Sequence, residues 1–279
     1  MPLPLSAVDE DCLMSSTTID SFAVFLRRVA PELLPPTTVD TSVPELLRHG
    51  RTVLAIRYSG GVGIAADLGS AMARHLRQSD IDRILGTDHR CAIGVAGAAG
   101  LAGEMIRLFQ AEVDHLEKIQ GQRISMDGRA TRLSSLVRSN GTMMAQGLAV
   151  TPLLAGWDDL AHRGRIFSYD GTGGRTEGKS HTCVGAGALF ASGVLNKGYR
   201  AGMDRDESVA LAIRALDTAI SDDTASSRSG PDLSRGLYPT VACADSHGVT
   251  RIPTEEVAVL AKRVVDQITA ESDREEGRS

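Results

Sequence analysis

The sequence has few of the residues on which several classes of protein depend. Only 4% of its 279 residues are aromatic, with a single tryptophan, and its four cysteines include no closely spaced pair. We therefore expect free thiols in a reducing compartment, rather than disulfides or zinc ligands. The seven histidines show no metal-ligand spacing, so we predict no metal site and no other cofactor.

An excess of positive charge and long apolar runs are also missing. Thirty Lys and Arg residues against thirty-five Asp and Glu residues give a net charge of −5, which argues against a nucleic-acid surface. No apolar run reaches the roughly 18 residues of a membrane span. The acidic N-terminal stretch lacks the continuous apolar region of a secretory signal. The chain is nevertheless 42% hydrophobic and long enough to bury a substantial core in one large domain.

The hydrophobic pattern changes between strand and helix spacing along the chain. After one short amphipathic helix between Ile19 and Val29, a hairpin of strands 52–58 and 62–67 is expected to turn at Gly60-Gly61. Further strands are expected at 83–85, 91–95, 148–156, 165–170, 181–186, 238–245 and 248–252. Helices are expected at 98–119, 128–146, 188–198, 206–220 and 254–270, before a charged flexible tail at 270–279. This pattern alone predicts an α+β fold with antiparallel hairpins.

Three features in the middle of the chain have plain structural interpretations. The segment Gly171 to Gly174 lacks the Lys-Ser/Thr and following helix of a phosphate loop, so we interpret it as a hairpin turn. Three arginines are expected at solvent or subunit contacts, namely Arg132, Arg138 and Arg165. Helical spacing predicts that the first long helix buries Met105, Leu108, Phe109, Val113 and Leu116.

A series of short motifs runs through the whole sequence. It comprises His49-Gly50, Tyr58-Ser-Gly-Gly61, Asp67, Gly94-Val-Ala-Gly97, Ala149 to Trp157, Gly164 to Asp170, Val184-Gly-Ala-Gly187 and Gly230 to Gly236. In this order and spacing the series resembles the β-type subunits of the actinobacterial 20S proteasome, which are N-terminal-nucleophile threonine proteases. The resemblance implies a propeptide-like leader at 1–50 and a proteasome β-type domain at 51–269. It also implies the four-layer α/β/β/α sandwich of the N-terminal-nucleophile hydrolases.

The resemblance implies a cellular role as well. Such a subunit would belong to the proteasome core particle and act in cytoplasmic protein degradation. Its partners would be proteasome α-ring subunits and other β subunits, either copies of itself or an active paralogue. An ATPase ring would deliver protein substrates through the α ring. No nucleic-acid or membrane partner is expected.

The resemblance also assigns roles to single positions. The nucleophile position is Arg51 where the family has threonine, the lysine position is Arg83, and the supporting serine position is Ala188. The supporting carboxylates would be Asp67 and Asp223, and Gly97 would donate to the oxyanion. The substrate-binding positions would be Ser70, Ala71, Ile81, Leu85, Val95 and Ala99. Because arginine has no hydroxyl, we expect a non-catalytic or weakly active subunit that keeps its leader.

Thr52 is the alternative nucleophile. Removal of the leader after Arg51 would give Thr52 a free amine, and the chain would then be an active threonine endopeptidase. A shift of one residue along a strand, however, turns a side chain to the opposite face of the sheet. We therefore favour the interpretation of Thr52 as an ordinary strand residue.

Overall fold

The first two strands are built from small and branched apolar residues that a tight turn folds back on each other. In the computed structural model, β1 (Val53–Tyr58) pairs with β2 (Gly61–Ala66) through a two-residue turn, Ser59-Gly60. Gly60 has a φ of 97°, a backbone conformation open to glycine, and it closes the hairpin. Gly61, which we expected in the turn, is already part of β2.

The structure describes residues 52–67, 84–86, 90–97, 99–145, 148–221, 231, 233 and 236–276, all within one compact unit, Val43–Ser279. The predicted leader, 1–50, lies outside the described residues. Within them, the first sheet has the order β10-β9-β2-β1-β8. Its remaining strands are β8 (His181–Val184), β9 (Thr240–Asp245) and β10 (Gly248–Arg251).

The second sheet has the order β3-β4-β5-β6-β7. Its strands are β3 (Ile84–Gly86), β4 (Cys91–Gly97), β5 (Val150–Asp158), β6 (Arg163–Tyr169) and β7 (Arg175–Gly178). Neighbouring strands are antiparallel in both sheets. The segment 171–174 turns β6 into β7, as its glycines predicted, although we did not predict β7 itself.

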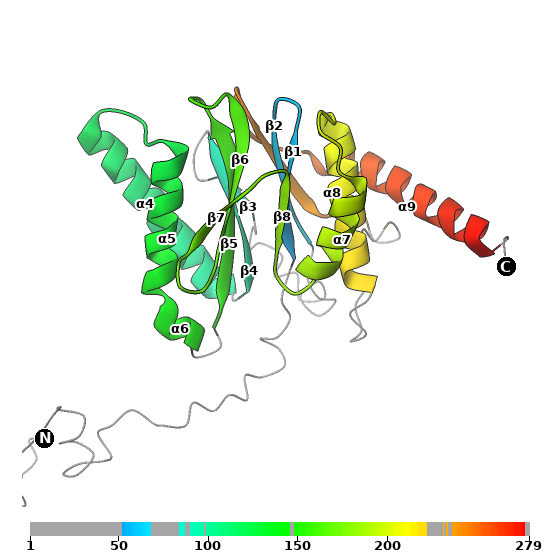
Figure 1. Ribbon diagram of the computed structural model, residues 1–279, viewed down its shortest axis with the longest axis horizontal. Coiled ribbons are helices and arrows are strands. Elements are labelled where there is room, and N and C mark those ends of the chain that lie inside the picture. Colours follow the sequence, from blue (N-terminus) through cyan, green and yellow to red (C-terminus); the bar gives the residue numbers. More distant parts are fainter. Residues whose placement is uncertain are drawn as a thin grey trace, which may run out of the picture. The chain divides into compact units, whose positions relative to one another are not determined.

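Helices cover the outer face of each sheet. The helices are α4 (Ala99–Gln120), α5 (Met126–Ser139), α6 (Gly141–Ala145), α7 (Ala188–Gly198), α8 (Arg205–Ser221) and α9 (Thr254–Glu276). Figure 1 shows α4 and α5 beside the second sheet, the two sheets face to face, and α7 and α8 beside the first sheet. The four-layer α/β/β/α sandwich is therefore confirmed.

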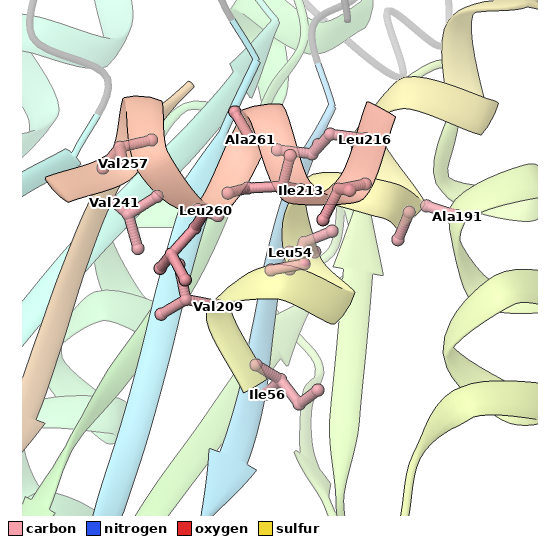
Figure 2. Packing of buried hydrophobic residues seen from close by; sticks show 14 of the residues in the cluster. Leu54, Ile56, Ala191, Val209, Ile213, Leu216, Val241, Val257, Leu260 and Ala261 are labelled. Carbon is pink, nitrogen blue, oxygen red and sulfur yellow. The ribbon is translucent and has the colours of Figure 1, made fainter. Parts of the chain in front are cut away.

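Three apolar clusters hold these layers together. One cluster lies between α4, α5 and the second sheet, and another lies between the two sheets. The third joins the first sheet to α7, α8 and α9, where Figure 2 shows Leu54 and Ile56 of β1 beneath Ile213 and Leu216 of α8. Burial of apolar surface at roughly 25 cal/mol per Å² is the main stabilising contribution of such layers.

Side chains of β1 alternate between two of these clusters. Leu54 and Ile56 face the helices, whereas Val53 and Ala55 lie between the two sheets. Successive side chains of a strand point to opposite faces, so this alternation fixes where each residue at the start of β1 is directed.

Several helix boundaries differ from the predictions. The helix expected at 128–146 is two helices, because Ser125 caps the first one early by accepting a hydrogen bond from the Gly128 N–H, and Asn140 ends it. The last helix continues to Glu276, into the segment predicted as a charged tail. Leu108 was predicted to be buried in α4 but is 50% exposed. The face of α4 that packs on the core includes Ile106 in its place.

Arg165 was expected at the surface but is the centre of a nearly buried charge network. Its side chain is 10% exposed and binds Asp158 at 2.8 Å, Asp127 at 2.6 Å and Glu177 at 2.7 Å. The hydrogen bonds from Arg165 hold the pKa values of Asp127 and Glu177 below their ordinary range. Burial acts to raise the pKa of Asp158, but hydrogen bonds from Arg165 and two backbone N–H groups lower it overall. The network joins β5, β6, β7 and α5.

Three of the four cysteines lie in the described residues, and all three are free thiols, as predicted: Cys91, Cys183 and Cys243. Cys12 lies outside the described residues. Among the residues that the structure describes, no helix is long and apolar enough to cross a bilayer. The same residues contain no cluster of side chains suited to a metal ion.

Candidate active site

The residues before β1 and after β2 face each other across the hairpin. The register pairs Val53 with Ala66, which brings Thr52 opposite Asp67. The Thr52 N–H donates to Asp67 Oδ2 at 3.0 Å, and the Asp67 N–H donates to the Thr52 carbonyl at 3.1 Å. Both residues are buried, with Thr52 2% exposed and Asp67 7% exposed. The carboxylate that the resemblance assigned to the site therefore binds the backbone of the alternative nucleophile.

The hydroxyl of Thr52 accepts a hydrogen bond at the start of α7. Gly187, the residue that precedes this helix, donates its N–H to Thr52 Oγ1 at 3.0 Å. A Cβ atom at Gly187 would lie 2.6 Å from that oxygen and 2.7 Å from the Ala219 Cβ, so only glycine fits between β1 and α8. Ala188 begins α7 and brings no hydroxyl to the position that the resemblance assigns to serine.

Gly97 ends β4 in a conformation that glycine favours. Its φ is 103°, and a Cβ atom would collide with the Ala149 carbonyl, because β4 pairs there with the start of β5. These two constraints explain the glycine without reference to chemistry.

Thr52 and Gly97 belong to different layers. Thr52 contacts Gly187 before α7, on the same face of β1 as Leu54 and Ile56. Gly97 belongs to the second sheet, and the face of β1 that is turned toward that sheet carries Val53 and Ala55. The strand alternation that we expected from the sequence is therefore present. The Thr52 hydroxyl points away from the sheet that carries Gly97.

Two predicted substrate-binding residues have described backbones only. Leu85 lies in β3 and Ala99 begins α4, and their side chains are outside the described residues. Val95 is 1% exposed and lies in the apolar cluster between the second sheet, α4 and α5. The remaining predicted site residues lie outside the described residues: Arg51, Ser70, Ala71, Ile81, Arg83 and Asp223.

Comparison with known proteins agrees with this architecture. The family model for proteasome subunits matches residues 47–230. The chain belongs to the proteasome subunit family. The resemblance to β-type subunits of the actinobacterial proteasome is confirmed by relatives from actinobacteria that are named proteasome subunit beta.

These relatives align over most of both chains. The subunit of Acidothermus cellulolyticus is 42% identical over 88% of this chain and 87% of its own. That of Jonesia denitrificans is 40% identical over 85% of this chain and 79% of its own. That of Streptomyces griseus is 38% identical over 88% of each chain.

Sequence reasoning missed the role of Gly187. The resemblance puts Gly187 in a glycine-rich segment of the family, but the hydrogen bond that it donates spans 135 residues of sequence. The only local signal is a glycine directly before an expected helix, where its N–H needs an acceptor from elsewhere. The structure supplies that acceptor from β1.

Proposed function

We propose that this proteasome subunit is a component of the core particle in cytoplasmic protein degradation and does not itself cleave peptides. The family's threonine position is Arg51, which has neither a hydroxyl nor a thiol to attack a carbonyl. The observation that carries the proposal is the environment of Thr52, the only candidate to replace that threonine. Its hydroxyl and its N–H are both bound within the fold.

The Asp67 contact disfavours Thr52 as a nucleophile even after cleavage of the leader. A terminal threonine needs a neutral amine that accepts the proton from its own hydroxyl. A free Thr52 amine would lie 3.0 Å from the Asp67 carboxylate, and a carboxylate so close stabilises the ammonium form. The hydroxyl would also have to leave the Gly187 N–H and cross to the other face of β1.

Exposed apolar side chains support a role inside an assembly. Leu108 and Ile119 of α4 are 50% and 69% exposed, and Leu189 of α7 is 80% exposed. Large apolar residues on both helix layers suit obligate interfaces, which typically bury on the order of 2,000 Å² or more. We expect the partners to be α-ring subunits and β subunits, with an ATPase ring acting through the α ring on protein substrates.

The processing experiment uses intact mass and N-terminal sequencing of the chain expressed without a partner protease. We expect a retained leader. Arg51→Thr should allow cleavage after Gly50, because it restores a hydroxyl at the scissile bond. Arg51→Thr combined with Thr52→Ala is the matched control and should still be cleaved. A clean Thr52 terminus on the unaltered chain would contradict the proposal.

The activity experiment compares rings of this subunit and α subunits in peptide hydrolysis. The unaltered ring should hydrolyse fluorogenic peptides at background rate. Arg51→Thr should give at most weak turnover, because Arg83 and Ala188 replace the family's lysine and serine. If the unaltered ring is active and Thr52→Ala abolishes that activity, the chain is an endopeptidase that uses Thr52.

The assembly experiment uses co-expression followed by size-exclusion chromatography with light scattering. We expect a large cylinder when α subunits and any active β paralogue are present. The leader segment between Phe22 and Val29 should speed assembly by covering apolar surface, and its deletion should slow it. A stable monomer that does not assemble with α subunits would instead indicate a stand-alone homologue.

A further inference from the structure

An open recess lies at the end of the sheets away from Thr52. Thr52 precedes β1 and Tyr58 ends it, and a six-residue strand spans about 20 Å. At the Tyr58 end, the β1–β2 turn, the start of β6, the β7–β8 segment and the residues after α7 surround an open cleft of about 530 Å³. We call this recess the turn cleft. Its volume is within the roughly 300–1,000 Å³ of small-molecule sites.

The lining of the turn cleft is rich in cationic side chains. Arg57, Arg163 and Lys179 all line it, and no aspartate or glutamate is among its lining residues in the part of the chain that the structure describes. The whole chain, by contrast, has a net charge of −5. Cationic groups from three separate segments therefore converge on one opening. Side chains of one sign in a concave site concentrate ligands of the opposite charge.

Contacts within the protein hold two of these cations, Arg57 and Arg163, in place beside the third, Lys179. Arg57 Nη1 donates to the Lys179 carbonyl at 2.7 Å, which ties β1 to the β7–β8 segment. Arg163 pairs with Glu177 at 3.2 Å, and the same carboxylate binds Arg165 at 2.7 Å, so Arg163 is fixed beside the Arg165 network. The Lys179 ammonium forms no ion pair with the described carboxylates, and its residue is exposed.

We propose that the turn cleft binds an oxyanion, a phosphate or carboxylate group, between Lys179, Arg57 and Arg163. Guanidinium and ammonium groups make charge-assisted hydrogen bonds to such oxygens, roughly twice as strong as neutral ones. The anion belongs either to a free phosphate-bearing small molecule or to an acidic peptide segment. The site is independent of proteolysis, because it lies at the other end of β1 from Thr52.

The protein carries its own reporter for this site. Trp157 lines the turn cleft and is the only tryptophan in the sequence. Its fluorescence therefore reports ligand entry without a label. The full-length protein, in the assembly in which it purifies, is titrated with sodium phosphate and separately with a hexaglutamate peptide. Sodium chloride keeps the ionic strength constant, because screening alone weakens exposed charge pairs.

The test variant is Lys179→Gln, and the control is Lys262→Gln, an equal charge change at an exposed position of α9. We expect a saturable fluorescence change whose dissociation constant rises about fivefold or more in Lys179→Gln and is unchanged in Lys262→Gln. Phosphate binding that depends on Lys179 identifies a small phosphate ligand, and binding of hexaglutamate alone identifies an acidic peptide. If neither ligand saturates, or if both variants weaken binding equally, the turn cleft is not an oxyanion site.

Discussion

Replacement of Arg165 by methionine should destabilise the protein more than any other single charge removal on β6. The substitution keeps an unbranched side chain but leaves Asp127, Asp158 and Glu177 without their shared cation. Asp158 carries most of the cost, because its side chain is only 8% exposed, whereas those of Asp127 and Glu177 are 54% and 34% exposed and partly solvated. Breaking a buried pair on one side costs about 3–5 kcal/mol.

The measurement is urea unfolding at pH 7.5, followed by intrinsic fluorescence. With a slope of about 2–3 kcal/mol per M for a domain of this size, a loss of about 3 kcal/mol lowers the midpoint by about 1–1.5 M. The control is Arg163→Met on the same strand. Its side chain is 45% exposed and it makes one ion pair, so the loss should not exceed about 1 kcal/mol.

The contribution of this network to the free energy of unfolding should change with pH in opposite directions in the unaltered protein and in Arg165→Met. Arg165 lowers the pKa of Asp127 and Glu177 below their ordinary values of 3.8 and 4.5, so the unaltered protein loses this stability as pH falls below about 4.5. Without Arg165, burial raises the pKa of Asp158, and protonation relieves the cost. The deficit of Arg165→Met should therefore shrink between pH 7.5 and 4.5. A deficit that grows on acidification, or a midpoint shift equal to that of Arg163→Met, would refute this account of the network.

Three other substitutions or reactions test the packing of the first sheet. Gly187→Ala should lower the free energy of unfolding by about 1–3 kcal/mol in thermal unfolding, because its Cβ would meet the Thr52 hydroxyl. The control Gly193→Ala, with no atom within 4 Å of the added Cβ, should be neutral or slightly stabilising, and equal effects would argue against the contact. Leu216→Ala should cost about 2–5 kcal/mol at its fully buried position, and the 80% exposed Leu189→Ala should change stability by less than about 0.5 kcal/mol. Burial raises the pKa of the Cys183 thiol to about 11, so its alkylation should be slow at pH 8 and should accelerate up to pH 11. If peptide mapping finds Cys183 labelled at pH 8 as fast as a free thiol, the thiol is accessible and this account is wrong.

Local sequence signals were sufficient for the elements that depend on their own residues. The β1–β2 hairpin follows from apolar strands on either side of a glycine turn, and α7 was predicted with its observed bounds, 188–198. The opposite directions of Thr52 and Val53 also follow from strand periodicity alone. The four layers, in contrast, came from the family resemblance, because alternation cannot say which sheet faces which.

Features made by distant residues could not be predicted from pattern. Arg165 meets Asp127 across 38 residues and Gly187 meets Thr52 across 135, and neither spacing leaves a periodic signal. The exposed Leu108 has the same cause. Helical spacing identifies an apolar stripe, but the position of the sheet decides which edge of that stripe is covered.

Glycines at the turn end of the sandwich bring the backbones of the two sheets into direct contact. A Cβ atom at Gly164 of β6 would lie 2.6 Å from the Gly61 carbonyl of β2, so the two backbones are in direct contact there. Toward the other end, the Val53 side chain stands between the sheets and meets Gly94. A Gly164→Ala substitution would force the sheets apart at their contact. Because paired strands are stiff, β1 and β2 would shift together, and the separation between Thr52 in the first sheet and Gly97 in the second would depend on a contact at the opposite end of the sandwich.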